Sequence, residues 1–531
     1  MSPIFDLMRC PSLSDVARGT RVGGDCMGHS GRGLLVCCAV LLCAGPAVAL
    51  EAMDTRLSFS FADDDVLRGP DKSPTGSPSI PNFSPSGNNR LFFDDYERRD
   101  NGFENLSYLV MYANKPGFFA GVDTEAGMVV RAQVTARTKE FSLTDDGSYV
   151  RFSKNFNGHR VGVTAFPVSA DRFRLGYSYD ISWGGARIFR NAQAVPGLRL
   201  EYESKGISAY LGAKTGFAQV DMQDGTKEMD TVWGILGGAA LDLHDNWRIE
   251  AGGGLFDRGT IDKRELRIVE NGKYNTPKWY GYGGTMQLTY HIGDPIGTPI
   301  DFRLYRNDPL AVQQFYAIPH YGPGLSLTAK SEISFVFQRL QDGDAASSTS
   351  TQMGIAGDIT VILKWRKWRM QNYVVYRDLA FMLYNVPSYP SFVDFSSGSQ
   401  VHADLLAFTN IDYYIESWHL LPGIILGLRR PASITGVADA TSAQSLGAQT
   451  FVFRSEADPD VLDPGDKVKL IFSAKATLRW DLSSIVSLLG ELQYSFDPNR
   501  RTFAQDENGI STRTASASSI LGFMAMMRAR F

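Results

Sequence analysis

The sequence predicts an all-β fold: a transmembrane, antiparallel, up-and-down β-barrel of about 18 to 20 strands. Three observations lead to this prediction. Polar and apolar residues alternate with a period of two along most of the chain. The connections between the alternating segments are short and long in turn, as in membrane barrels. After residue 50 there is no continuous apolar run of about 18 residues, the length that a membrane-spanning helix requires.

Residues 1–49 are predicted to be a secretory signal peptide. An apolar run from Leu34 to Leu42 follows a basic residue, and small residues continue up to Ala49, where we expect cleavage. Met27 would be a more typical start for such a signal. All five cysteines precede the expected cleavage site, so the exported chain has no disulfide and depends on backbone hydrogen bonds and packing.

Residues 50–103 are expected to form an N-terminal segment outside the barrel. A short strand-like piece from Leu57 to Phe61 is followed by an acidic triplet and by a spacer rich in Pro, Ser and Gly. Such a spacer cannot bury a core and is typical of a loop or linker. The barrel itself is predicted to occupy residues 104–531.

Alternation is clearest in long segments with one apolar and one polar face. Residues 120–134 show it, and so do residues 172–183, where the apolar residues from Phe173 to Trp183 oppose Arg172, Arg174 and Asp180. Both segments are predicted to be strands with lipid on one side and water on the other. Tryptophans are expected at the strand ends as an interfacial girdle: Trp183, Trp233, Trp247, Trp365, Trp368 and Trp480.

The connections are expected to distinguish the two ends of the barrel. Short turns are predicted at 204–206, 244–246, 366–367, 415–417 and 481–483, and long loops at 218–229, 257–279, 383–400, 429–466 and 498–516. Outer-membrane barrels have short turns on the periplasmic side and long loops outside. Residues 300–323 are either a strand or a loop that folds into the pore.

The last residues of the chain carry a resemblance to a known class. From Ser519 to Phe531, apolar residues alternate with glycine and arginine, and the chain ends on an aromatic residue. This pattern resembles the C-terminal strand of porin-like Gram-negative outer-membrane β-barrels. The resemblance implies an outer-membrane location with both termini in the periplasm, contact with lipid and lipopolysaccharide, and recognition of Phe531 as an insertion signal by the barrel-assembly machinery.

Charged residues that share the inward phase are predicted to line a pore. They are Arg131, Arg151, Arg172, Arg174, Asp180, Arg199, Glu201, Glu203, Arg248, Glu250, Lys330, Glu332, Lys475, Arg479, Glu491, Arg528 and Arg530. Two interpretations stay open. Opposite charges pair across strands and stiffen the wall, or the basic excess creates a mildly positive field that favours anions.

The predicted function is a pore-forming channel for hydrophilic solutes. One alternative is an exopolysaccharide exporter, which resembles alginate-export barrels in architecture only and implies periplasmic export partners. Another is a structural or adhesive barrel that uses its long outer loops. The histidines show no metal-ligand spacing, so no enzyme, metal or cofactor is expected. A net charge of −4 and the absence of a motif argue against nucleic-acid binding. The solute and the choice between monomer and trimer stay open.

Overall fold

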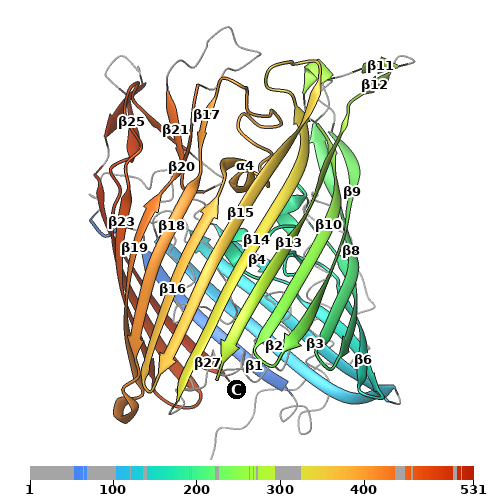
Figure 1. Ribbon diagram of the computed structural model, residues 1–531, viewed down its shortest axis with the longest axis vertical. Coiled ribbons are helices and arrows are strands. Elements are labelled where there is room, and N and C mark those ends of the chain that lie inside the picture. Colours follow the sequence, from blue (N-terminus) through green and yellow to red (C-terminus); the bar gives the residue numbers. More distant parts are fainter. Residues whose placement is uncertain are drawn as a thin grey trace, which may run out of the picture. The chain divides into compact units, whose positions relative to one another are not determined.

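A computed structural model describes most of the chain after residue 52 (Figure 1). The described residues are 53–63, 65–67, 103–119, 121–135, 140–190, 192, 194–221, 227–261, 263–266, 268–270, 273–293, 324–436, 449–455, 459–505, 511–515 and 517–530. The predicted signal peptide 1–49, most of the predicted linker, residues 300–323 and Phe531 lie outside these ranges.

One closed antiparallel sheet forms the wall of a barrel. Its segments are β1 (Met53–Asp63), β2 (Phe103–Phe119), β3 (Val122–Thr135), β4 (Phe141–Asp145), β5 (Tyr149–Phe156), β6 (His159–Phe166), β7 (Gly197–Ser204), β8 (Ile207–Asp221), β9 (Lys227–His244), β10 (Trp247–Thr260), β13 (Lys278–Ile292), β14 (Leu325–Gln341), β15 (Thr349–Trp365), β16 (Trp368–Arg377), β18 (Asp404–Tyr413), β19 (Leu420–Arg430), β23 (Ile471–Asp481), β24 (Val486–Phe496) and β27 (Ser519–Arg530).

The wall has 18 strands although the sheet contains 19 segments. The segments β4 and β5 both pair with the same side of β3, so together they count as a single strand. The ring closes where β1 pairs with β2 on one side and with β27 on the other. The predicted fold class and strand number are therefore confirmed.

The first strand of the barrel was placed wrongly by the sequence. Residues 53–63 were predicted to belong to a segment outside a barrel that starts at residue 104, but β1 is part of the wall and pairs with the C-terminal strand from Arg56 to Asp63. The alternating pattern of β1 is short, and a spacer rich in Pro, Ser and Gly separates it from the next alternating segment. The sequence therefore carried no sign that β1 belongs to the wall. A ring in lipid must pair both of its edges, and β1 provides the partner that β2 and β27 need.

Side chains alternate between the two faces of the wall as predicted. On the outer face Leu211, Leu470 and Leu492 are 56%, 59% and 50% exposed, whereas inward-facing Arg199 and Arg528 are 1% and 2% exposed. An apolar exterior around polar interior side chains is typical of a barrel that spans a membrane. No helix within the described ranges is long and apolar enough to cross a membrane.

Aromatic pairs mark the end of the barrel at which the short turns lie. Trp247 and Tyr290 have ring centroids 4.6 Å apart, and so do Trp368 and Tyr413. Trp365 and Trp480 are also about half exposed near these turns. The interfacial girdle is therefore present at this end, but Trp183 is no part of it, because its side chain is 4% exposed and lies inside the barrel.

Most short turns lie at one end and most longer connections at the other, as the sequence predicts. The connection between β13 and β14 is an exception, because Ile292 and Leu325 both lie at the end with the short turns. The turns after β7, β9, β15 and β23 are short, and the longer connections carry small elements of their own (Figure 1). These are β11 (Ile268–Glu270), β12 (Lys273–Asn275), β17 (Gln400–His402), β20 (Ala432–Thr435), β21 (Thr450–Phe453), β22 (Asp460–Leu462), β25 (Arg501–Gln505), β26 (Ser511–Ala515), η2 (Tyr179–Ile181), η3 (Ala186–Ile188), η4 (Arg264–Leu266), η5 (Glu416–Trp418, in a short turn) and α4 (Leu379–Met382).

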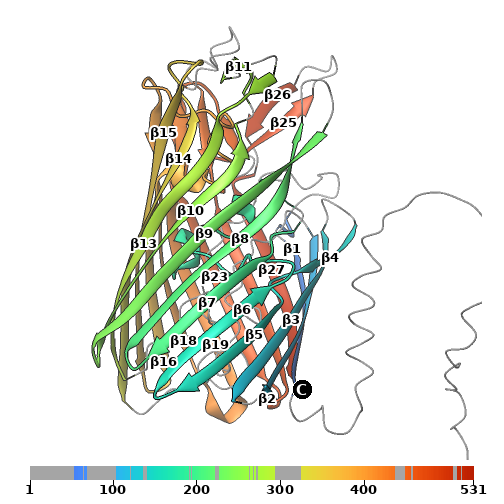
Figure 2. The same cartoon turned by 90° about the vertical axis from the view of Figure 1, so that its right-hand side faces the viewer.

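The wall is uneven in height. The strands β5, β6 and β7 have 8 residues each, whereas β14 and β15 have 17 each (Figure 2). Residues 218–221 and 227–229, predicted as loop, extend β8 and β9 on the side with long strands. The connection between β6 and β7 starts from the low part of the wall and is the longest inward excursion among the described residues.

Candidate functional site

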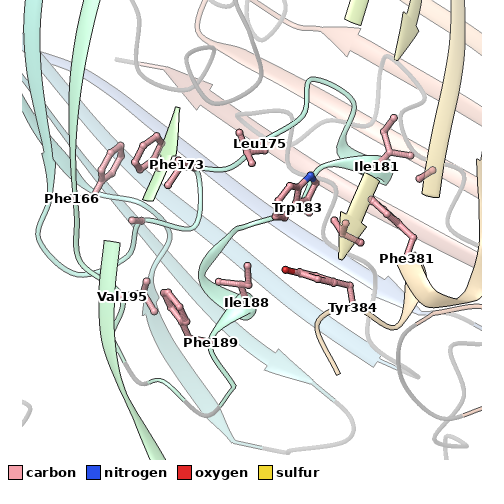
Figure 3. Close-up of a cluster of buried hydrophobic side chains, with 14 of the residues drawn as sticks. Phe166, Phe173, Leu175, Ile181, Trp183, Ile188, Phe189, Val195, Phe381 and Tyr384 are labelled. Carbon is pink, nitrogen blue, oxygen red and sulfur yellow. The ribbon is translucent and has the colours of Figure 1, made fainter. Parts of the chain in front are cut away.

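Residues 167–196, which connect β6 to β7, fold into the interior of the barrel and are here named the lumen loop. The structure describes this loop apart from residues 191 and 193. The prediction that residues 172–183 form a membrane-spanning strand is wrong. Phe173, Leu175 and Ile181, expected to face lipid, are fully buried and lie beside Trp183 inside the barrel (Figure 3).

Backbone geometry explains why this alternating segment is not a long strand. Leu175 and Trp183 exchange two backbone hydrogen bonds of 2.9 Å, so that the chain doubles back on itself between them. Gly176 and Gly184 have φ values of +99° and +80°, which only glycine adopts readily. A period-two pattern therefore arises here from a small hairpin whose apolar side chains are buried by the wall.

The inner surface of the wall accommodates these apolar side chains at glycine positions. The ring of Phe173 packs against Phe166 and Tyr210, with centroids 6.1 and 5.9 Å away, and occupies the space that a side chain at Gly212 would need. Leu175 similarly covers Gly252 and Gly254, where an added Cβ would lie 2.9 and 3.0 Å from its methyl carbons. Glycines at inward positions thus make room for the loop.

Lys214 of β8 anchors the base of the lumen loop. Its ammonium group donates hydrogen bonds to three loop carbonyls, those of Ala170 (2.9 Å), Phe173 and Gly184 (2.7 Å). The three donors of a lysine ammonium are thereby satisfied in a site where its side chain is almost fully buried. The two arms of the loop are held together at one point.

Arg258 of β10 joins the lumen loop to a second segment, residues 378–399, here named the second insert. The guanidinium donates to the carbonyl oxygens of Ile188 (2.7 Å) and Tyr384 (2.8 Å). Its carbon also lies 3.4 Å from the centroid of the Trp279 ring. A buried cation bonded to both segments and stacked on an aromatic ring links them to the wall.

Glu332 of β14 holds the tip of the lumen loop. Its carboxylate accepts hydrogen bonds from the backbone amides of Tyr177 (2.9 Å) and Ser178 (2.7 Å). Next to this contact, the Ser178 hydroxyl lies 2.7 Å from the Tyr373 hydroxyl of β16, which donates to Asp180 at 3.0 Å. The loop therefore reaches from β6 across the inner wall to β16.

Asp171 organises the loop from within. It pairs with Arg174 and accepts a hydrogen bond from the amide of Ala186 (2.8 Å). Burial alone would raise the pKa of Asp171, but Arg174, Arg172 and the Ala186 amide hold it below the ordinary value. Arg172 in turn contacts Asp146 at 2.8 Å. The two arginines are therefore loop residues bound to carboxylates and are not neighbours on one strand of the wall.

The second insert packs as a small apolar body above β15 and β16. Asp378 caps the helix α4 by accepting a hydrogen bond from the Phe381 amide at 2.7 Å. Leu379 and Leu383 of this insert are buried against Ile434 of β20 and Phe453 of β21. The strands β17, β20, β21 and β22 form a separate four-stranded sheet at the end of the barrel with the longer connections (Figure 1).

The structure places the other predicted pore residues on the inner face of the wall, and many are ion-paired. Arg151 contacts Glu125 and Glu201, Arg248 contacts Asp242 and Glu250, and Lys475 contacts Glu491 at 3.0 Å. Further inward residues of the predicted set are Arg131, Arg199, Glu203, Lys330, Glu332, Arg479 and Arg528, and the backbone of Arg530 pairs with Arg56 of β1. Pairing across strands thus accounts for much of the charge, and the sign of the lumen field stays a prediction.

Sequence reasoning missed the chain of charges beside the loop tip. Asp404 accepts hydrogen bonds from Arg377 (2.6 Å) and Arg429 (2.6 Å), and Arg377 lies 3.7 Å from Asp180. Arg258 was missed as well. A usable signal existed, because glycines occupy consecutive inward positions on β10 (Gly252 and Gly254) and β13 (Gly281 and Gly283), where polar residues are expected. Such glycines indicate that side chains from elsewhere in the chain pack against the wall from inside.

In the described parts of the chain, no three His, Cys, Asp or Glu side chains are placed to hold a metal ion together.

The geometry of the second insert makes one variant informative. Replacing Gly281 of β13 by alanine should destabilise the folded protein by about 1 to 3 kcal/mol through overpacking, because the new Cβ would overlap the Tyr384 hydroxyl. The measurement is the unfolding midpoint of the purified protein on a heat-modifiability gel. Gly490→Ala is the control, since an added Cβ there meets nothing within 4 Å. Equal midpoints for the two variants would contradict the packing described here.

Comparisons with known proteins concern the architecture. No protein-family model matches the chain, and no curated protein matches it. Several solved structures of Pseudomonas proteins are similar to it. OpdL of Pseudomonas aeruginosa (TM-score 0.40, 9% identity) covers 90% of this chain and 98% of its own. The outer membrane protein opdK of the same organism has a TM-score of 0.41 and 9% sequence identity, and the match covers 91% of this chain and 99% of opdK. For a BenF-like porin from Pseudomonas fluorescens Pf-5, the TM-score is 0.41 and the sequence identity 9%, and the match covers 90% of this chain and 98% of the porin. The barrel architecture itself is shown by the strand pairing of this chain.

Proposed function

We propose that the protein is an outer-membrane channel through which hydrophilic solutes pass, and that the lumen loop narrows its passage. The observation that carries this proposal is a closed barrel with an apolar exterior whose interior holds a loop anchored by the buried charges of Lys214, Arg258 and Glu332. A structural barrel needs only the wall, whereas a loop held inside the wall suits the selection of solutes.

The physical argument starts from the lipid. Backbone groups in a bilayer must be paired within the protein, and the closed ring of strands satisfies this requirement. A barrel with about 16 or more strands is too wide for its wall side chains alone to fill the interior, so that a water-filled lumen remains unless loops fold inward. The lumen loop contacts the inner face at β8, β10, β14 and β16.

Orientation and partners follow from the same proposal. The short turns would face the periplasm, together with the two ends of the barrel domain, and the second insert would face outward. Lipopolysaccharide and lipid would contact the apolar exterior, and the barrel-assembly machinery would insert the chain. No observation on the described residues favours the exporter or adhesive alternative.

Conductance in planar bilayers tests the proposal. The purified, detergent-folded protein should produce stepwise current increases in a symmetric chloride solution, and the heat-denatured protein should produce none. Folding is checked by heat-modifiable migration on a gel. A correctly migrating protein that never conducts would refute the channel.

The prediction of a mildly basic lumen requires a separate measurement. The reversal potential in a salt gradient should indicate anion preference, and Lys364→Glu on the inner face of β15 should shift it toward cations. The shift should shrink at high salt, because the screening length falls to about 3 Å at 1 M. Lys154→Glu is the control, since this exposed residue shares the outward phase of Val150 and Phe152. Cation preference in the wild-type protein would contradict the basic lumen.

A further inference from the structure

Two carboxylates face each other beneath the tip of the lumen loop. Glu332 on β14 and Asp358 on β15 are directly opposite in the strand register, and their residues are 3% and 5% exposed. Side chains at opposite positions of antiparallel strands have Cβ atoms about 4.5 to 5.5 Å apart. Two like charges are therefore held close together in a site from which water is largely excluded, and this arrangement costs free energy.

The two carboxylates are bonded very differently. Glu332 accepts hydrogen bonds from the amides of Tyr177 and Ser178 and from the Thr285 hydroxyl at 2.8 Å. Asp358 accepts one from Thr360 at 3.3 Å through Oδ2, whereas its Oδ1 atom has no hydrogen-bond partner among the described residues. Of the two carboxylates, Glu332 is thus the one that binds the backbone amides of the loop tip, whereas Asp358 acts on the tip through its charge and through the side chain of Ser178.

Other charged and titratable groups surround the pair on every element that packs there. Lys330 lies two residues before Glu332 on β14 and acts on Asp358. The lumen loop contributes Asp180, and β16 contributes Tyr373 and Arg377, which bond or pair with Asp180. From β13, the uncharged Gln287 is opposite Glu332 in register.

We propose that Glu332 and Asp358 form a proton-sensitive latch that holds the tip of the lumen loop against the wall and releases it in acid. This proposal rests on the proposed channel function. An ionised Glu332 makes charge-assisted hydrogen bonds to two amides, and these are about twice as strong as bonds between neutral groups. Protonation of Glu332 weakens these bonds and relieves its repulsion from Asp358, so acid favours the released state.

Release would move the tip and leave the base of the loop in place. Lys214 binds the carbonyls of Ala170, Phe173 and Gly184, and Arg258 binds that of Ile188, all of them away from the tip. Both cations keep their charge in mild acid, so these contacts persist when Glu332 is neutral. The part that moves is therefore the segment around Tyr177 and Ser178, whereas Asp180 keeps its contacts with Tyr373 and Arg377.

Single-channel recording over a range of pH tests the latch. The wild-type channel should switch from a quiet state to a frequently fluctuating, more conducting state as the pH falls, with a definite midpoint. Glu332→Gln should fluctuate at every pH, because the amides lose their charged acceptor. Asp358→Asn should move the midpoint by about one pH unit to lower pH, a tenfold higher proton concentration, because the repelling charge is gone.

Controls separate the latch from the channel. Asp412→Asn neutralises an inward, buried carboxylate of β18 that pairs with Arg369 far from the loop, and should keep the wild-type midpoint. Heat-modifiable migration on a gel confirms that each variant folds. If Glu332→Gln does not fold, the shift of the pH midpoint in Asp358→Asn tests the latch. A pH response that is unchanged in both latch variants overturns the latch and leaves the channel intact. Absence of conductance in the wild-type protein at every pH overturns the channel itself.

Discussion

Replacing Leu492 by arginine is expected to destabilise the folded barrel by about 2 to 4 kcal/mol, the cost of a cation near the bilayer midplane. Leu492 lies in the middle of β24, and half of its side-chain surface is exposed on the outer face. Its strand partners Ala476 and Phe523 have the same outward phase, so no inward water can reach the new charge. The measurement is the free energy of unfolding by denaturant in lipid vesicles.

Leu482→Arg is the matched control for this variant. Leu482 is exposed to a similar extent but lies in the turn after β23, where an arginine is expected to cost about 0 to 1 kcal/mol because it reaches the interface. Equal penalties at the two sites would argue against a membrane-spanning wall. The inner face requires a different expectation: Lys475 is buried and ion-paired with Glu491, so replacing it by methionine removes this ion pair from a buried carboxylate and should also be destabilising.

Replacing Arg258 by leucine is expected to free both inward segments at once. The variant loses hydrogen bonds to the carbonyls of Ile188 and Tyr384 and the stacking on Trp279, each involving a charged group. Bonds of this kind contribute about 1.5 to 3 kcal/mol each. The expected result is a larger and noisier conductance with rapid proteolytic cleavage near Tyr384, while the wall still migrates as a folded barrel.

Arg339→Leu is the control for the loss of a β-strand arginine. Arg339 on β14 is exposed and bonds Thr349 of the neighbouring strand at 3.1 Å, without contact to either inward segment. Its conductance and cleavage pattern should equal those of the wild-type protein. If Arg258→Leu also behaves like the wild-type protein, the inward segments are held by apolar packing and Arg258 is not their link.

The strands of the wall could be predicted from the sequence because the pattern that defines them is local. Each strand must present apolar side chains to lipid and polar ones to the interior, and this requirement recurs every two residues wherever the chain crosses. The hairpins at Ser204–Ile207 and Trp365–Trp368 and the outward phase of Leu492 follow from that rule. The wrong assignment of β1 arose because its alternating segment is short. Leu57 and Phe59 already show the alternation.

The lumen loop could not be read in the same way. Phe173, Leu175 and Ile181 alternate as lipid-facing residues do, but a buried hairpin inside the barrel satisfies the same pattern. Inward glycines on other strands, such as Gly212 and Gly252, make room for these apolar side chains inside the barrel. They are distant in sequence and come close to the loop only when the sheet closes. The same holds for Glu332, which has the phase of a pore residue and binds two amides of the loop instead.

The all-β class, the approximate number of strands and the two faces of the wall follow from the sequence alone, because lipid on one side imposes a period of two that each segment carries. Which alternating segments belong to the wall and which fold inward depends on the tertiary structure. That choice depends on contacts between residues about 40 to 200 positions apart, such as Lys214 with Ala170 and Ser178 with Tyr373. These contacts form only when the ring closes, so their contribution to the free energy cannot be predicted from a local sequence pattern.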